Sequence, residues 1–186
     1  MPRTDHRNGA TRQHSRPAIR PLQPDDIEQV RLLWGANVLD ELEILSYDRW
    51  GPGIAVPVRE DVAEAKVQTL DPKEGMTRLL EHLVTSTDAF CLVHDGDTSI
   101  LGYVVASVED QGVNDFRSAK IDELYVREDS RRQGIATGLV QAALAELRRR
   151  DAWVFRVEVN TNWKAGRRFW DSQRWEQDAV LYRLYD

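Results

Sequence analysis

Cysteine is almost absent from this chain of 186 residues, since Cys91 is the only one. A single cysteine can form no internal disulfide, which fits a reducing compartment and leads us to expect a cytoplasmic protein. Long apolar runs are missing as well: a run such as Ile100 to Val105 falls far short of the roughly 20 residues that a membrane helix needs. The segment Met1 to His6 lacks the apolar stretch of a secretory signal. We therefore expect a soluble protein with no membrane partner.

Positive charge is not in excess either. The formal net charge is -6 at pH 7, whereas nucleic-acid binders normally present a basic surface to phosphates, so no nucleic-acid partner is expected. A negative surface suits a cationic substrate, although it also serves solubility. The four histidines are scattered without the spacing of metal ligands, and no metal is predicted.

The length and the 41% of hydrophobic residues are sufficient for one domain with a core. Residues 1–16 contain four arginines, two histidines and hardly any apolar side chain, so they are predicted to form a disordered tail. The domain is expected to occupy residues 17–186. Within it, the range of about 40–70 shows no regular pattern around the turn at Trp50 to Gly53, and we interpret it as a helical or loop insertion.

Periodic apolar residues and turn residues predict an alternation of helices and strands. Helices are expected to begin at Pro24 and Asp71, where proline and acidic residues stand in the first turn, and to span Ile135–Arg150 and Trp163–Gln173. β-Branched and apolar residues predict strands at Pro17–Leu22, Ala89–His94, Ile100–Val108, Ile121–Val126, Val154–Asn160 and Val180–Tyr185. This order predicts an α/β or α+β domain with a mixed central sheet flanked by helices.

The segment from Arg131 to Val140 joins a predicted strand to a predicted helix. Helix N-termini present backbone NH groups without intrahelical partners and the positive end of the helix dipole. Gly134 and Ala136 leave the backbone open to an anion, and the arginines add charge, so the pattern predicts a pyrophosphate site. The alternative is a solvated basic surface turn. The motifs Gly-x-Gly-x-x-Gly and Gly-x-x-x-x-Gly-Lys-Ser/Thr are absent.

Leu124-Tyr125-Val126 followed by Arg131-Arg132-Gln133-Gly134-Ile135-Ala136 resembles the acetyl-CoA motif of the GNAT superfamily of N-acetyltransferases. The family pattern is Gln/Arg-x-x-Gly-x-Gly/Ala, which Arg131, Gly134 and Ala136 match. The order of elements agrees from about residue 18 to residue 186, although 40–68 has no evident counterpart. The resemblance implies a GNAT-like single-domain fold, acyltransferase activity and acetyl-CoA as the acyl donor.

By resemblance, the backbone of Leu124, Tyr125 and Val126 pairs with the pantetheine arm as a strand would, and the Val126 NH helps to stabilise the oxyanion. The diphosphate would be held by the residues Arg131, Arg132, Gln133, Gly134, Ile135, Ala136 and Thr137. Ordinary sheet pairing is the alternative for the strand residues. In the family the cofactor enters a gap between diverging parallel strands, which here would be the strands Ile121–Val126 and Val154–Asn160.

Direct attack on a thioester needs no covalent nucleophile, but an attacking ammonium group with a pKa of about 10 must first lose a proton. Glu123 lies one residue before Leu124, on the strand beside the expected acyl group, and is the candidate general base. Its alternative reading is a solvated carboxylate at a strand edge. Asp122, expected on the other face of the strand, is the reserve base.

The last helix departs from the family pattern, which often has a tyrosine near the cofactor sulfur as general acid. Aligned without gaps, that position is Trp170, and an indole cannot donate a proton usefully at neutral pH. The acid is then Tyr182, Tyr125 or water, and Tyr182 is our first candidate. Trp170 could still pack against the cofactor.

The same alignment puts Trp163 on an asparagine of the family pattern and Gly166 on its alanine. Asn162, one place from the family asparagine, is the candidate for a pantetheine contact.

The sequence thus predicts an enzyme, an N-acetyltransferase that moves acetyl from acetyl-CoA to a primary amine by direct attack in a ternary complex. A non-catalytic acyl-CoA-binding or regulatory module of the same fold is the alternative, and a general anion-binding domain is a third. The acceptor can be a small molecule or a peptide amine, and the acyl group can be longer than acetyl. The oligomeric state stays open, a homodimer included, because the strand Val180–Tyr185 could be left at a sheet edge.

Overall fold

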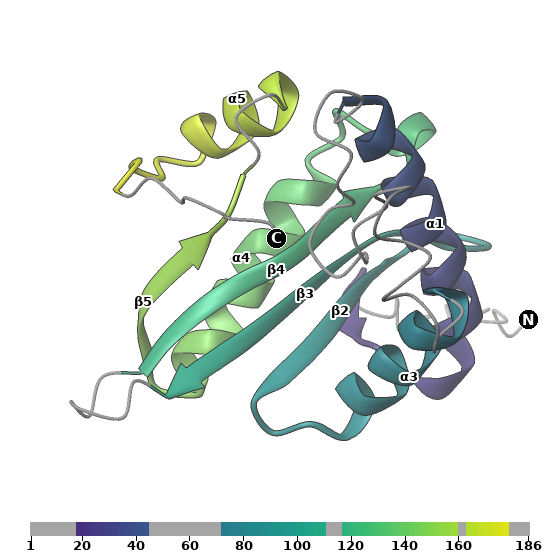
Figure 1. Ribbon diagram of the computed structural model, residues 1–186, viewed down its shortest axis with the longest axis horizontal. Helices are drawn as coiled ribbons and strands as arrows, with labels where there is room; N and C mark the ends of the chain where they lie inside the picture. The colour runs from purple at the N-terminus through teal and green to yellow at the C-terminus, as the bar shows by residue number, and fades with distance from the viewer. Residues whose placement is uncertain (1–17, 45–71, 111–116, 160–162, 179–186) are drawn as a thin grey trace, which may run out of the picture.

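Residues 18–44, 72–110, 117–159 and 163–178 are described by the structure, a computed structural model shown in Figure 1. Within them lies a five-stranded sheet whose strand order follows the chain, β1-β2-β3-β4-β5. Neighbouring strands are antiparallel except β4 and β5, which are parallel. The strands are β1 (Ile19–Pro21), β2 (Ala89–Asp95), β3 (Ile100–Asp110), β4 (Arg117–Val126) and β5 (Ala152–Val157). The mixed central sheet predicted from the sequence is confirmed.

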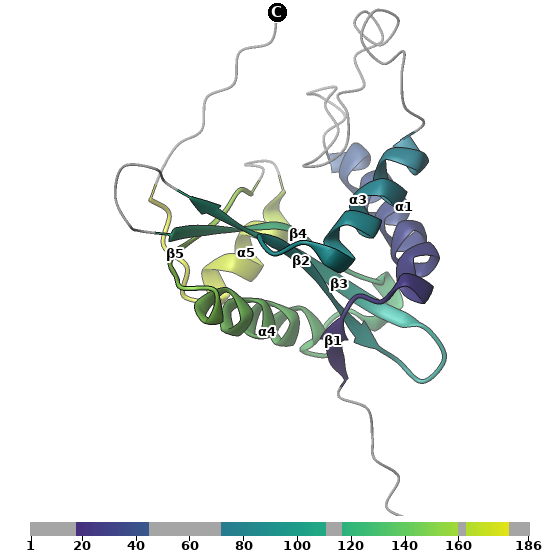
Figure 2. The same ribbon diagram turned by 90° about the horizontal axis from the view of Figure 1, so that it is seen from below.

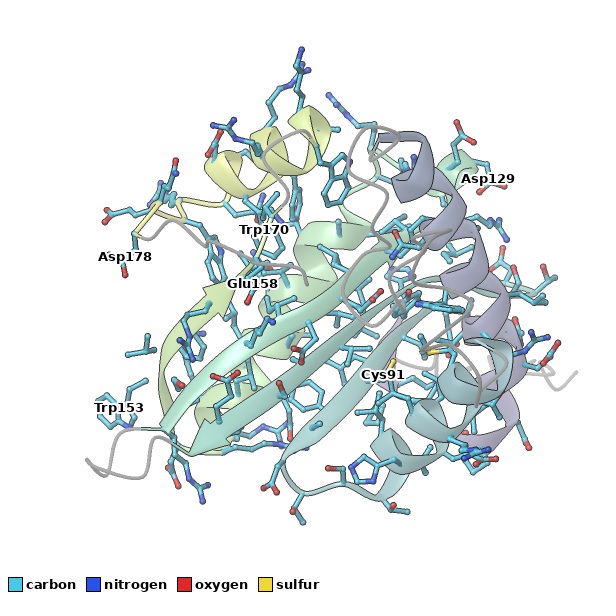
Figure 3. The ribbon with its side chains drawn as sticks, in the orientation of Figure 1. Cys91, Asp129, Trp153, Glu158, Trp170 and Asp178 are labelled. Atoms are coloured by element: carbon cyan, nitrogen blue, oxygen red, sulfur yellow. The ribbon has the colours of Figure 1, made fainter. Side chains whose placement is uncertain are left out.

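Helices cover both faces of this sheet. α1 (Ile27–Ile44) and α3 (Pro72–Thr85) lie on one face and α4 (Ile135–Arg149) on the other, as Figure 2 shows. α5 (Lys164–Ser172) follows β5, and its Trp170 projects toward the sheet on the α4 side (Figure 3). The 3-10 turns η1 (Pro24–Asp26) and η2 (Glu128–Ser130) precede α1 and α4.

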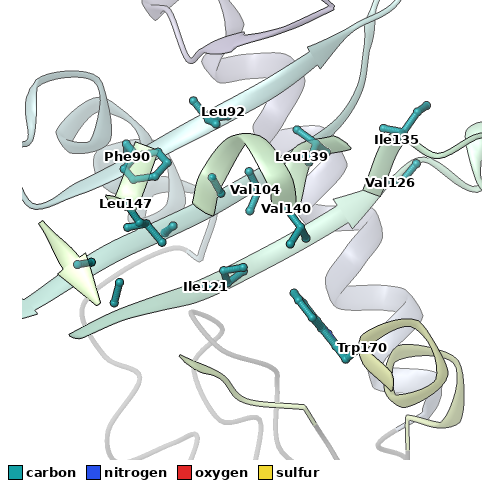
Figure 4. Close-up of a cluster of buried hydrophobic side chains, with 14 residues drawn as sticks. Phe90, Leu92, Val104, Ile121, Val126, Ile135, Leu139, Val140, Leu147 and Trp170 are labelled. Carbon is teal, nitrogen blue, oxygen red and sulfur yellow. The ribbon is translucent and has the colours of Figure 1, made fainter. Parts of the chain in front are cut away.

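Alternation along the strands divides the core into two clusters, because successive side chains point to opposite faces. On the α4 face, Leu139, Val140, Ala143 and Leu147 recur at helical spacing and are buried against the sheet (Figure 4). The strands supply Phe90, Leu92, Val104, Ala106, Ala119, Ile121 and Val126 to this cluster. α4 is thereby fixed across the middle of the sheet.

The opposite face is packed by α1 and α3. Their buried apolar residues are Val30, Leu33 and Trp34 on α1 and Met76, Leu80 and Leu83 on α3. They pack with a sheet surface formed by Cys91, Val93, Ile100, Tyr103, Val105 and Tyr125. A polar residue, Asn37, is buried on the same helix, with 4% of its surface exposed.

An ion-pair network ties β1 to the start of α1 and the end of β2. The Arg20 guanidinium lies 2.5 Å from Asp26 Oδ2 and 2.7 Å from Asp95 Oδ2. Hydrogen bonds to Asp26 and Asp95 raise the pKa of Arg20 above its usual range, so the side chain stays charged. Asp26 also accepts a hydrogen bond from the backbone NH of Gln23, which caps the helical turn.

Strand boundaries differ from the prediction at β4 and β5. β4 begins at Arg117 rather than Ile121, because its pairing with β3 already starts between Arg117 and Asp110. In this first half of the strand, Ser118 and Lys120 bind Glu109 and Glu158. The polarity of these residues hides the first half of the strand. β5 is Ala152–Val157 rather than Val154–Asn160, since the tight turn after α4 ends at Asp151, whose φ is 62°.

The predicted helix starts are confirmed at η1 and at Pro72 of α3. α1 continues to Ile44, so its last turn falls in the range that the sequence assigns to an insertion. The tail 1–16, most of the insertion and the predicted strand Val180–Tyr185 lie outside the described residues.

Candidate functional site

β4 continues beyond its pairing with β5. Their pairing extends from Arg117 with Ala152 to Ile121 with Val157, whereas β4 itself continues to Val126. β5 ends at this last pair, and Figure 1 shows α5 beyond the end of β5. Among the described residues, no strand therefore runs beside β4 on this side from Asp122 onward. The gap between diverging strands stays a prediction, because β5 ends at Val157 and Asn160 lies outside the described residues.

A β-bulge lies where the pairing of β4 with β5 ends. Val105 of β3 pairs with Glu123 and the next residue, Ala106, pairs with Ile121, which leaves Asp122 as the extra residue on β4. Such a bulge turns two consecutive side chains to the same face of a sheet. The prediction that Asp122 lies on the opposite face from Glu123 is wrong for this reason.

The side-chain contacts agree with this assignment. Asp122 Oδ2 accepts a hydrogen bond of 2.6 Å from Ser107 Oγ, and Glu123 Oε2 accepts one of 3.2 Å from the hydroxyl of Tyr103. Tyr103, Val105 and Ser107 alternate along β3, so their side chains point to the same face. Tyr103 and Val105 pack with the apolar residues of α1 and α3 on that face. Two adjacent carboxyl groups therefore face the α1 side of the sheet.

Glu123 is buried, with 6% of its surface exposed, which excludes the alternative of a solvated strand-edge carboxylate. Asn37 Nδ2 on α1 donates a second hydrogen bond to Oε2, at 3.1 Å. Burial and then the negative charge of Glu123 raise the pKa of Tyr103 well above its usual value. Tyr103 consequently stays protonated and acts as a donor to the carboxylate.

Asp122 is more exposed to solvent than Glu123 and lies beside charged side chains. Lys120 Nζ lies 4.0 Å from its Oδ1 and 3.1 Å from Glu158 Oε1. Burial raises the pKa of Asp122, while the Ser107 hydrogen bond and Lys120 oppose that rise. The bulge thus places two carboxyl groups of unequal environment next to each other.

The loop between β4 and α4 exposes a helix start. Gly134 is the N-cap of α4 in a left-handed conformation, with φ 82°, and no side chain caps the helix. A Cβ at Gly134 would meet no atom within 4 Å, and the first turn of α4 contains no acidic residue. Residues Arg131, Arg132 and Gln133 before it are exposed. Open backbone NH groups beside positive charge fit a diphosphate.

Arg131 connects this loop to the end of β4. Its Nε donates a hydrogen bond of 2.9 Å to the Val126 carbonyl, and its guanidinium lies 5.4 Å from the centroid of the Tyr125 ring. The acidic side chain nearest in sequence, Asp129, is engaged by Arg127 at 2.6 Å, and this hydrogen bond lowers the pKa of Asp129. The Arg131 side chain is thereby held between the end of β4 and the start of α4.

α5 compensates internally for two departures from the family pattern. A Cβ at Gly166 would collide with the ring of Trp163, so the glycine makes room for the tryptophan. Trp170 is 6% exposed and makes edge-to-face contacts with Phe169 and Trp175 at centroid distances of 5.1 Å. Trp170 is therefore a core residue on the α4 side, as Figure 4 shows.

The structure brings together Glu123, the β4 residues Leu124 to Val126 and the segment from Arg131 to Thr137, which comprises the loop and the first turn of α4. Asn162 and Tyr182 lie outside the described residues. Sequence reasoning missed Asn37 and Tyr103 as partners of Glu123. The signal for Asn37 was a polar residue at helical spacing from the apolar Val30 and Trp34.

Two further properties concern the described residues alone. None of their helices is long and apolar enough to cross a membrane. Their histidine, cysteine, aspartate and glutamate side chains form no group of three or more that could hold a metal ion.

The acetyltransferase (GNAT) family matches residues 58–173. No curated protein matches the chain.

Among solved structures, a predicted acetyltransferase with acetyl-CoA from Clostridium acetobutylicum is 16% identical, with a TM-score of 0.66 over 90% of this chain and 94% of that one. A ribosomal-protein-alanine N-acetyltransferase from Brucella melitensis biovar Abortus 2308 is 18% identical, with a TM-score of 0.61 over 90% and 97%. An aminoglycoside acetyltransferase from an uncultured soil metagenomic sample, in complex with sisomicin, is 18% identical, with a TM-score of 0.61 over 90% and 94%. These structures share the fold, and the family match covers more than half of the sequence. The chain belongs to the GNAT family of acetyltransferases.

Proposed function

We propose that the protein is an acetyl-CoA-dependent N-acetyltransferase that moves an acetyl group to a primary amine by direct attack in a ternary complex. The observation that carries this proposal is the meeting of two features at one place. The end of β4 that continues beyond β5 leads directly into the exposed, basic start of α4. The pantetheine arm of acetyl-CoA is extended and carries a diphosphate at one end. A strand edge followed by an anion site matches that order.

The donor would be held by the chain's own backbone along most of its length. Leu124 to Val126 offer strand-like backbone groups to the pantetheine arm, and the NH of Val126 supports the oxyanion. Arg131, Arg132 and Gln133 surround the diphosphate, while Gly134 to Thr137 offer NH groups of the first helical turn. When bound, acetyl-CoA supplies an activated thioester.

Direct attack is favoured because the chain offers no suitable thiol for a covalent intermediate. Cys91 is the only cysteine and is 1% exposed. Burial, with smaller contributions from Asp26 and Glu123, raises the pKa of its thiol well above the usual range. A thiol held in its neutral form is a poor nucleophile.

Glu123 is the proposed general base, which takes the proton of the acceptor ammonium through water. Its carboxylate lies next to Leu124 on the strand and is shielded from bulk solvent. Asp122 remains the reserve base. The proton for the departing thiolate is assigned to Tyr182, with Tyr125 or water as alternatives, because Trp170 cannot provide it.

An amine acceptor is supported by what similar structures are named for, an aminoglycoside in one and a ribosomal-protein alanine in another. The net charge of -6 suits a cationic acceptor. The alternative, a non-catalytic acyl-CoA-binding module, is favoured by one observation. Trp170 is buried at the position where the family often has a tyrosine that acts as general acid.

A single assay separates these two functions. Thiol release from acetyl-CoA is measured with a polyamine, an amino acid, an aminoglycoside and a short peptide, in the wild type and in Glu123→Gln. We expect turnover of at least one amine, and a loss of about 100-fold to 10,000-fold in Glu123→Gln, because general-base catalysis contributes that much. Glu158→Gln, which changes an exposed carboxylate paired with Lys120, is the control and should retain activity.

Binding of acetyl-CoA without turnover of any amine would favour the module instead. An unchanged rate and pH profile in Glu123→Gln, with turnover present, would remove Glu123 from the mechanism and leave Asp122 as the base.

A further inference from the structure

Two side chains from different elements bind the same oxygen of Glu123. Asn37 lies on α1, 86 residues earlier in the chain, and Tyr103 lies on β3. All three residues are buried, with 4%, 1% and 6% of their surfaces exposed for Asn37, Tyr103 and Glu123. The carboxylate is thus held from the helix above it and from the neighbouring strand.

Packing alone does not explain these two polar residues. Asn37 follows Val30 and Trp34 along the buried face of α1, and Tyr103 is followed on β3 by the buried Val104 and Val105. A buried amide or hydroxyl lowers stability unless it is hydrogen-bonded, and an apolar residue would fill either position at no such cost. Each polar group finds its acceptor in Glu123.

The chemistry of the two donors suits a carboxylate that must accept a proton. Both are neutral, so they stabilise the ionised form and fix its orientation without cancelling its charge. A lysine or arginine would cancel that charge. Among the described residues, Cys91 on β2 and Tyr125 on β4 are titratable groups on this face of the sheet. Burial raises the pKa of Cys91, so it stays a neutral thiol. On β4 itself, the neighbouring Asp122 is bound to Ser107 rather than to Glu123.

We propose that Asn37 and Tyr103 are positioning residues of the general base, holding the Glu123 carboxylate ionised and oriented through their hydrogen bonds to its Oε2. The proposal rests on the proposed function of Glu123. It also gives α1 a role in the reaction, because this helix carries Asn37, one of the two hydrogen-bond donors to Glu123. Glu123 lies on β4, the strand that ends at the proposed acetyl-CoA site. The proposal assigns both residues a contact with the base alone, through Oε2 of Glu123.

The chain offers a matched pair of variants for the test. Tyr103→Phe removes a hydroxyl bound to Glu123, and Ser107→Ala removes a hydroxyl bound to Asp122, on the same face of the same strand. For the amine that the wild type acetylates best, kcat/KM is measured against pH. Because a lost hydrogen bond to a charged group is worth about 10-fold to 100-fold, Tyr103→Phe should lower kcat/KM by at least about 10-fold on the acid side.

The acid limb of the Tyr103→Phe profile should move to higher pH, with recovery of activity in more alkaline solution, because the carboxylate form has lost a donor. Ser107→Ala should leave the limb in place, and the KM for acetyl-CoA should be unchanged in both variants. Asn37→Ala provides a second variant with the same expectation, should Tyr103→Phe not fold by circular dichroism. A limb that coincides with the wild type, or that moves equally in Ser107→Ala, would overturn the proposal.

A second readout needs no turnover. The carboxyl carbon of Glu123 is followed by nuclear magnetic resonance through a pH titration, with Glu123→Gln identifying the signal. We expect its titration midpoint to rise in Tyr103→Phe and in Asn37→Ala. An unchanged midpoint would overturn the proposal even if no amine were acetylated, whereas a wild type without turnover but with a moved midpoint would count against the proposed function alone. A moved midpoint with an unmoved rate limb would reduce the two hydrogen bonds to a structural role and refute the positioning role.

Discussion

Asp122 and Glu123 are neighbours in the chain whose carboxyl groups have different surroundings. The bulge turns both toward α1. Asp122 keeps 25% of its side chain exposed beside Lys120, whereas Glu123 is buried and accepts hydrogen bonds from the neutral groups of Asn37 and Tyr103. Unequal environments of adjacent carboxyl groups allow them to take different roles. In our account Glu123 accepts the proton of the amine, while Asp122 belongs to a charged surface that continues to Glu158.

The Asp122 environment predicts a pH effect on stability. Burial raises the pKa of Asp122, so between its ordinary and its raised value the folded state keeps a proton that the unfolded state has released. The contribution of this carboxyl group to the free energy of unfolding therefore falls as pH rises through that window. In urea unfolding at pH values from about 3.5 to about 7, Asp122→Asn should lose less stability with rising pH than the wild type.

Asp129→Asn is the control with the opposite sign. Hydrogen bonds from Arg127 and Ser130 lower the pKa of Asp129, so its contribution is present above the ordinary pKa and is lost as pH falls. Asp129→Asn should thus flatten the acid side of the stability curve. Parallel curves for Asp122→Asn and the wild type would contradict the assigned environment of Asp122.

At the scale of the element, α5 accommodates the large side chain of Trp163 because Gly166 has no side chain. Trp163 stands where the family pattern has asparagine, and its ring occupies the space that a Cβ at Gly166 would need. The ring of Trp170 then packs between Phe169 and Trp175 on the α4 side. Changes in this helix are therefore expected to be coupled rather than additive.

Gly166→Ala tests this coupling. The added methyl group would collide with Trp163, so the variant should lower the free energy of unfolding by about 1–3 kcal/mol in spite of the better helix propensity of alanine. Gly75→Ala in α3, where nothing lies within 4 Å of the added Cβ, should instead gain up to about 1 kcal/mol. Chemical denaturation measures both, and Trp163→Asn combined with Gly166→Ala should restore stability. Equal effects at Gly75 and Gly166 would refute the collision.

Local sequence patterns were sufficient for the elements that are regular and strongly periodic. The hairpin of β2 and β3 and the apolar stripe of α4 follow from spacings of two and of three or four residues, and the loop before α4 follows from its glycine and arginines. The partners of Glu123 could not be predicted, because their contacts span 86 and 20 residues. The orientation of Asp122 depends on a bulge that exists only in the pairing of β4 with β3.

For the whole molecule, β4 is where the two faces of the sheet meet in function. The α4 side contributes the helix start and loop proposed for the diphosphate, and the α1 side contributes the proposed base with its two donors. β5 ends opposite Ile121, so among the described residues no strand pairs with this side of β4 between the two sites. A donor entering along this edge would bring its acyl group to the strand that carries Glu123.

The central claim is that backbone NH groups at the start of α4 bind the diphosphate of acetyl-CoA, and one calorimetric experiment tests it directly. Acetyl-CoA is titrated into the wild type, Gly134→Ala and Gly134→Glu. Both variants bear the same strain at φ 82°, but only the glutamate adds negative charge where the phosphates should lie. We predict that Gly134→Glu binds at least about 10-fold more weakly than Gly134→Ala, a difference of about 1.4 kcal/mol or more. Equal affinity in these two variants, both folded by circular dichroism, would contradict the account.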